Sequence, residues 1–218
     1  MRGYWHWDEP VEPLRELLRR GGVLAIPTES SYGLGADPRN PKGVEAIYRI
    51  KGREPRKALP VVVADLGQLA DLGIDPGLSI LRPLSACWPG PLTVLLPLLE
   101  PWQELPAAAG EPSLAVRIPG HDRLRELLGA LGHGLTATSA NVSGREPVLD
   151  PAEAAKLLAG EDGMVVDGGV LPGGPPSTVV AIEEAGPVVL RTGVFPVERL
   201  REALRQSGLL RTAQGEEV

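Results

Sequence analysis

The chain has 218 residues, of which 43% are hydrophobic and 23% are charged, and its formal net charge is −6. This composition excludes a disordered chain and a coiled coil, and no apolar run approaches the ~18 residues of a membrane span. A single cysteine, Cys87, excludes an internal disulfide and a zinc site built from several cysteines. The N-terminus lacks the apolar stretch of a signal peptide, so we expect a cytoplasmic protein without a membrane partner.

Apolar residues at helical spacing, together with capping residues, predict a series of helices. The first starts at Val11 and stops at the Gly21-Gly22 pair, and Asn40-Pro41 resembles an N-cap followed by proline at the first helical position. In chain order the predicted helices begin at Val11, Asn40, Asp75, Leu124, Asp150 and Val197, and the helix from Asp75 ends near Trp88.

Short apolar runs bounded by Gly, Pro or Asp predict strands between these helices. They are Val23 to Ile26, Leu59 to Val63, Leu92 to Leu96, Leu114 to Ile118, Met164 to Val166, Thr178 to Ile182 and Val188 to Leu190. Some strands follow one another without a helix between them, so we expect a twisted mixed sheet in the α/β class. The chain is predicted to form one domain over residues 1–218, with a core of about 10–205 and a polar tail over 206–218.

Three segments carry candidate chemistry. Pro27 to Gly35 follows a strand and is dense in hydroxyls, with two glycines that permit close backbone approach, as in α/β ligand sites. An ordinary connecting loop is the alternative. Thr136 to Gly144 brings small hydroxyl and amide groups, which either orient a ligand or satisfy their own turn.

The third segment is a run of cations, Lys51, Arg53, Arg56 and Lys57, after a predicted helix. It indicates a polyphosphate clamp, a favourable charge at a helix C-terminus or a solvated surface run. No P-loop motif is present, so a nucleotide site must be of another kind. Arg117 on a short apolar strand needs an anionic partner or a ligand, and Arg191 follows another strand.

Together these segments resemble the YrdC-like threonylcarbamoyl-AMP synthases. The motifs that match in chain order are Pro27 to Leu34, Lys51-Gly52-Arg53, Trp88 to Thr93, Val116 to Pro119, Ser139-Ala140-Asn141, Pro176 to Val179 and Arg191 to Gly193. The resemblance covers about residues 10–200 and implies one α/β domain with a concave, positively lined cavity. It implies that L-threonine, bicarbonate and ATP become threonylcarbamoyl-AMP and pyrophosphate, the first step of forming N6-threonylcarbamoyladenosine in tRNA.

The resemblance also implies roles for particular residues. Lys51, Arg53, Ser139 and Asn141 would act on the phosphates and the carbamate, while ATP would contact Arg53, Lys57, Ser113, Ser139 and Arg191. Threonine would contact Thr28, Ser30, Tyr32 and Arg117, with Arg117 on its carboxylate. Mg²⁺ would arrive with ATP, and tRNA and the proteins that transfer the product to it would be partners.

The sequence departs from the family pattern at several positions. Ser30 replaces a threonine, Lys57 an asparagine near the nucleotide, Val62 a histidine near the threonine, and Pro147 stands where many members have a serine. Two other interpretations are a double-stranded RNA-binding module and a divergent carbamoyl-adenylating enzyme that uses another substrate. The net charge of −6 and the lack of an RNA-recognition signature count against the RNA-binding interpretation.

Overall fold

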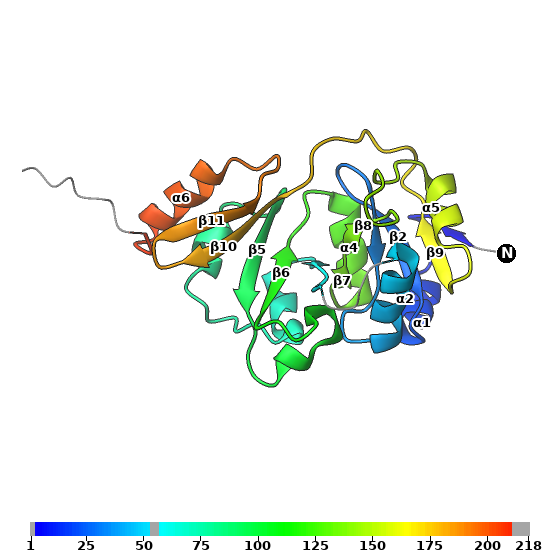
Figure 1. The fold of residues 1–218 in the computed structure, drawn as a ribbon, viewed down its shortest axis with the longest axis horizontal. Coiled ribbons are helices and arrows are strands. Elements are labelled where there is room, and N and C mark those ends of the chain that lie inside the picture. Colours follow the sequence, from blue (N-terminus) through cyan, green and yellow to red (C-terminus); the bar gives the residue numbers. More distant parts are fainter. Residues whose placement is uncertain (1–2, 53–56, 211–218) are drawn as a thin grey trace, which may run out of the picture.

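Helices and strands alternate along the chain in the computed structural model, which describes residues 3–52 and 57–210 (Figure 1). The α-helices are α1 (Glu12–Arg19), α2 (Pro41–Lys51), α3 (Leu81–Leu84), α4 (Asp122–Leu131), α5 (Pro151–Leu157) and α6 (Val197–Gln206). The strands are β1 (Tyr4–Trp5), β2 (Val23–Pro27), β3 (Tyr32–Gly35), β4 (Val61–Val62), β5 (Leu92–Pro97), β6 (Ser113–Arg117), β7 (Leu135–Thr136), β8 (Thr138–Ser139), β9 (Gly163–Val166), β10 (Thr178–Glu183) and β11 (Gly186–Arg191). Short 3-10 helices occupy Leu66–Leu72, Trp102–Glu104 and Pro106–Ala108. The α/β class is confirmed.

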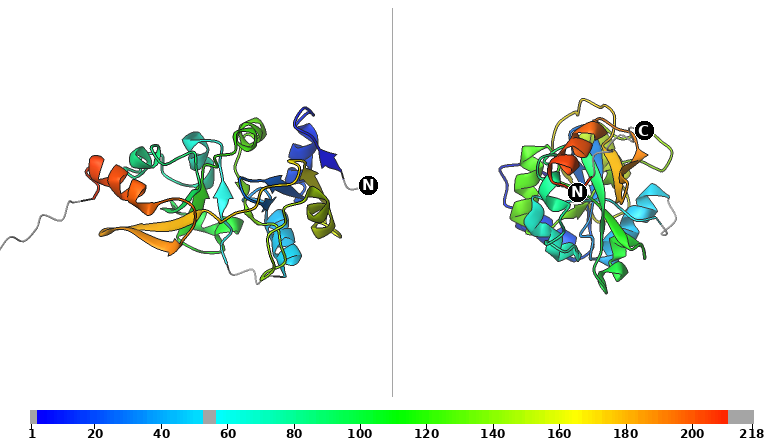
Figure 2. Two further views of the ribbon diagram at one scale, coloured as in Figure 1. Left: turned by 90° about the horizontal axis from the view of Figure 1, so that it is seen from above. Right: turned by 90° about the vertical axis from the view of Figure 1, so that its left-hand side faces the viewer.

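The strands form two mixed sheets. One is 5-stranded, in the order β1-β9-β2-β3-β8, and the other is 6-stranded, in the order β11-β10-β5-β6-β4-β7. Each contains parallel and antiparallel pairs, such as β2 with β9 and β2 with β3. The mixed character is therefore confirmed, but the strands divide between two sheets. These sheets lie side by side along the long axis, with α6 and β1 near opposite ends (Figure 2).

A single residue, Ala137, separates the edges of the two sheets. β7 pairs with β4 in the 6-stranded sheet, and β8 pairs with β3 in the 5-stranded sheet. Thr136 fastens this junction, because its backbone N–H donates to the carbonyl of Ala36 and its hydroxyl accepts from the N–H of Ala36, both at 2.9 Å. The residues around Ala137 are thereby held where the sheets meet.

Two predicted segments differ from the observed structure. The helix expected from Asp75 to Trp88 is reduced to α3, because the Asp75 carboxylate accepts from the backbone N–H of Gly77 and forms a local turn instead. The predicted loop from Pro27 to Gly35 is a short turn followed by β3, which pairs antiparallel with β2.

The apolar faces of α1 and α4 pack in one hydrophobic cluster with β2. Leu14, Leu17 and Leu18 of α1 and four leucines of α4 are buried there, with Leu24 and Ile26 of β2. Burial of such faces supplies most of the stability of short helices. Among the described helices, none combines the length and the apolar character that crossing a bilayer requires.

Asn40 joins the beginning of α2 to the end of α1. Its side-chain oxygen accepts from the backbone N–H of Lys42, as predicted for an N-cap, and its amide donates to the carbonyls of Leu18 and Arg19. We expect Asn40→Ala to lower the free energy of unfolding by about 1–2 kcal/mol, measured by urea denaturation. Asn40→Ser keeps the acceptor but not the amide donor, so its loss should be smaller. Equal stability of Asn40→Ala and the unaltered protein would contradict this account.

Candidate functional site

A cavity of about 330 Å³ lies between the two sheets and is lined by segments that are distant in the sequence. The Pro27-to-Gly35 segment contributes Thr28, Ser30, Ser31, Tyr32 and Gly33, and the second predicted segment contributes Ala137, Thr138 and Ser139. The 6-stranded sheet contributes Pro60 to Val62, Thr93, Ala115, Arg117, Val179 and Arg191. Hydroxyl groups therefore dominate one wall, and the other wall combines apolar side chains, the Thr93 hydroxyl and two cations.

The charged side chains in the described cavity lining are two arginines, Arg117 and Arg191. Burial lowers the pKa of both guanidinium groups from the ordinary value of arginine, and the charge of Arg191 lowers the pKa of Arg117 further. Arginine nevertheless stays protonated in proteins. Two cations, the half-buried Arg117 and the more exposed Arg191, with no carboxylate in the described lining make the cavity suited to anionic ligands.

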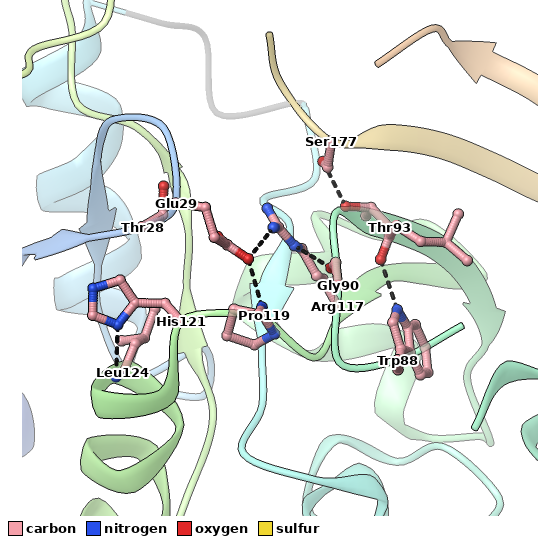
Figure 3. A network of polar contacts seen from close by, with 12 residues as sticks. Thr28, Glu29, Trp88, Gly90, Thr93, Arg117, Pro119, His121, Leu124 and Ser177 are labelled. Atoms are coloured by element: carbon pink, nitrogen blue, oxygen red, sulfur yellow. Dashed lines mark hydrogen bonds and ion pairs between the residues drawn. The ribbon is translucent and has the colours of Figure 1, made fainter. Parts of the chain in front are cut away.

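Arg117 has the anionic partner that its place on an apolar strand requires. Its Nη2 donates to the Glu29 carboxylate at 2.6 Å, and its Nε donates to the carbonyl of Gly90 at 2.9 Å (Figure 3). Glu29 was not among the predicted site residues, although it lies within the first motif. The sequence did contain a signal for it: Glu29 is the one acid in that motif, and Arg117 on its apolar strand needs a counter-charge.

Arg191 is held by Ser177, which lies in the matching motif Pro176 to Val179 but was not among the predicted site residues. Its Nη2 donates to the carbonyl of Ser177 at 2.9 Å and to the Ser177 hydroxyl at 3.0 Å. The Ser177 hydroxyl is also 2.9 Å from that of Thr93 (Figure 3). Thr93 and Ser177 both line the cavity, so they extend its polar surface beyond the predicted residues.

Lys51 is the last residue of α2 and is only 4% exposed. Its ammonium group donates to the backbone carbonyl of Ser139 and to the side-chain oxygen of Asn141, both at 2.6 Å. The Ser139 hydroxyl donates to the same Asn141 oxygen at 2.8 Å. Ser139 and Asn141 thus converge on Lys51, and Lys51 holds the second motif in place. Only Ser139 of these residues lines the cavity.

The hydroxyls of Thr28 and Tyr32 have structural partners. Thr28 donates to the carbonyl of Ser31 at 2.7 Å, which closes the turn before β3. The Tyr32 hydroxyl donates to the carbonyl of Gly169 and accepts from the N–H of Gly168. Burial raises the pKa of Tyr32, so this hydroxyl stays protonated. Both residues line the cavity, but their hydroxyls are engaged elsewhere.

Other predicted residues lie away from the cavity or outside the described structure. Lys57 is exposed, and Ser113 begins β6 on the same face as Ala115 and Arg117; neither is in the lining. Arg53 falls in 53–56, outside the described residues. Cys87 is buried away from the cavity, and burial raises the pKa of its thiol, as is typical of an unreactive core cysteine.

The fold and the site together define the class of this protein. It is an α/β protein with a cavity that lies between two mixed sheets and is lined by cations. The family model Sua5_yciO_yrdC, described as "Telomere recombination", matches residues 16–193. The chain belongs to this family, and the resemblance found in the sequence is confirmed.

Individual relatives agree with the family. The threonylcarbamoyl-AMP synthase of Bacillus subtilis (strain 168) is 34% identical over 197 residues, which are 90% of this chain and 57% of that protein. The structure of P. abyssi Sua5 complexed with L-threonine has a TM-score of 0.77 and 30% identity, over 89% of this chain and 57% of that chain. E. coli YciO has a TM-score of 0.75 and 28% identity, over 92% of this chain and 100% of that chain. The chain therefore spans just over half the length of some relatives and the whole of another.

The contacts of Lys51 give a prediction about stability. Lys51→Met would leave the Ser139 and Asn141 oxygens without their buried donor, so the free energy of unfolding should fall by about 2–4 kcal/mol. Lys42→Met, at an exposed position of the same helix, should change it by less than about 0.5 kcal/mol. Denaturant titration of both variants measures the difference. A Lys51→Met protein as stable as Lys42→Met would show that these bonds do not hold the second motif.

Proposed function

We propose that this protein is a threonylcarbamoyl-AMP synthase, which converts L-threonine, bicarbonate and ATP into threonylcarbamoyl-AMP and pyrophosphate. The observation that carries the proposal is the cavity in which Arg117 and Arg191 lie among hydroxyls from both sheets. The synthase name of the B. subtilis relative and the L-threonine complex of P. abyssi Sua5 support it. The product would serve the first step of forming N6-threonylcarbamoyladenosine in tRNA, with tRNA and the transfer proteins as partners in the cytoplasm.

The chemistry needs orientation and charge more than a protein nucleophile. The amine of threonine attacks the carbon of bicarbonate to form a carbamate and water; a carbamate oxygen then attacks the α-phosphorus of ATP, and pyrophosphate leaves. Two anions must approach each other, so preorganised cations lower the barrier. Mg²⁺ would be bound mainly by the ATP phosphates and water.

In this proposal Arg117 binds the carboxylate of threonine, and Thr28, Ser30 and Tyr32 form the wall beside it. Their common position in the cavity lining supports this assignment. We assign ATP to Arg53, Lys57, Ser113, Ser139 and Arg191, of which Ser139 and Arg191 line the cavity. Lys51 and Asn141 would act with them at the phosphates and carbamate. The Ser139 and Asn141 contacts of Lys51 favour positioning of that wall as its role.

The reaction is tested by ATP–pyrophosphate exchange, with threonine and bicarbonate present and then with each omitted. We expect exchange only when both are present, because the carbamate is the nucleophile. Exchange that needs bicarbonate and another small amine instead of threonine would favour the divergent carbamoyl-adenylating enzyme, for which Val62 in the lining is the specific observation. No exchange, with salt-sensitive binding of double-stranded RNA, would favour the RNA-binding module.

The phosphate assignment predicts a loss of ATP affinity without loss of the fold. Arg191→Ala and Arg53→Ala should each weaken ATP binding about ten- to a hundredfold, since each removes a charge-assisted contact. Arg205→Ala, on the exposed side of α6, is the matched control and should leave ATP binding unchanged. Calorimetric titration with ATP and a melting curve for each variant provide the measurement. Unchanged ATP affinity in a folded Arg191→Ala or Arg53→Ala protein removes that residue from the site.

Ser30 in the cavity wall predicts poor discrimination between threonine and serine. Ser30→Thr restores the methyl group of the family motif, and one such contact changes selectivity by about tenfold. We therefore expect the ratio of threonine to serine affinity, measured with ATP present, to rise by about tenfold. Ser79→Thr, at an exposed position, should leave the ratio unchanged. If Ser30→Thr leaves the ratio of threonine to serine affinity unchanged, the side chain of the bound amino acid does not contact residue 30.

A further inference from the structure

Glu29 connects three segments around the cavity through one carboxylate. Its Oε1 accepts from Nη2 of Arg117 at 2.6 Å and from the backbone N–H of Gly120. Arg117 in turn donates from Nε to the carbonyl of Gly90 at 2.9 Å. Figure 3 shows the Glu29 carboxylate between the turn after β2 and the end of β6, next to the guanidinium. One acid thereby fixes the loop after β2, the turn before α4 and the end of β6.

The guanidinium of Arg117 is held at two of its three nitrogens. Because this group is planar and rigid, fixing Nε and Nη2 also fixes the direction of Nη1. Nη1 has no hydrogen-bond partner among the described residues, and Arg117 lines the cavity. Both N–H groups of Nη1 are therefore left to donate to an anionic ligand.

Glu29 itself is absent from the described lining of the cavity, although Thr28 and Ser30 on either side belong to it. Its hydrogen bonds therefore act on a ligand through Arg117 and not by direct contact. The second oxygen, Oε2, is buried and has no hydrogen-bond partner in the described structure. A buried acceptor without a partner costs stability, so a native protein that keeps one needs a physical reason, of which a functional role is one. This cost favours a role for Glu29 beyond holding the fold together.

We propose that Glu29 is a positioning residue, which aims Nη1 of Arg117 at the carboxylate of the amino-acid substrate. The proposal rests on the proposed function, because it takes threonine as the ligand of Arg117. Two effects of Glu29 oppose each other at this site: its hydrogen bond orients the guanidinium, whereas its charge repels an incoming carboxylate. The proposal states that orientation is the larger effect.

The test compares L-threonine with L-threoninamide, which keeps the amine and the side chain but lacks the carboxylate charge. Both are titrated by calorimetry with ATP present, and the ratio of their affinities reports the contact with Arg117. Glu29→Met removes the acceptor and should lower the threonine preference by about tenfold or more, with ATP affinity within about twofold. Glu29→Gln keeps a neutral acceptor and should recover part of this loss. A merely structural role would weaken both ligands alike and leave the ratio unchanged.

Glu161→Met is the matched control, because Glu161 forms a two-bond pair with Arg49 at 2.9 Å outside the cavity lining. It should leave the ratio unchanged. If Glu29→Met does not fold, Glu29→Gln alone decides, with a loss of preference of about threefold expected. An unchanged or increased threonine preference in a folded Glu29 variant overturns the positioning role and leaves the proposed function standing. If the unaltered protein binds neither ligand, the proposed function fails, and the positioning role fails with it.

Discussion

A buried ammonium group governs the junction of the two sheets. Removing the charge of Lys51 from water is costly, so its Nζ must be surrounded by oxygens, and those of Ser139 and Asn141 lie within hydrogen-bond distance. These residues follow directly after Ala137, where the chain passes from one sheet to the other. The end of α2 is thereby bonded to the cavity wall at Ser139.

Arg117 and Arg191 make the cavity positive, and their bonding partners limit the loss of stability that these charges cause. Two arginines in one cavity repel each other, and a partly buried one such as Arg117 lowers the stability of the folded protein unless it has a partner. Arg117 is balanced by Glu29, and Arg191 is bound by the uncharged oxygens of Ser177. Glu29 thus neutralises the charge of Arg117, whereas Arg191 keeps its full charge. The cavity therefore combines an oriented donor, Arg117, with a second cation, Arg191, whose charge is not balanced by a carboxylate.

The departures from the family pattern are distributed unevenly around this cavity. Ser30 and Val62 belong to its lining, whereas Lys57 and Pro147 are exposed and lie outside it. Relative to the family pattern, Ser30 lacks a methyl group and Val62 lacks an imidazole ring. Both arginines of the cavity are retained. The two substitutions therefore alter the shape and hydrogen bonding of the wall without altering the charge that attracts anions.

Local chemistry determined much of the secondary structure from the sequence alone. The Asn40 cap with proline after it, the Asp150 cap and the leucine stripes of α1 and α4 act within a few residues, so the predicted α1, α2, α4, α5 and α6 are observed. The same reasoning overestimated the helix after Asp75, where a side chain bonds its own turn. Only the tertiary structure decided the division into two sheets, the burial of Lys51 and the pairing of Arg117 with Glu29. Those outcomes depend on contacts between residues about 90 positions apart, such as Lys51 with Asn141, and no local pattern specifies which distant partner satisfies a buried charge.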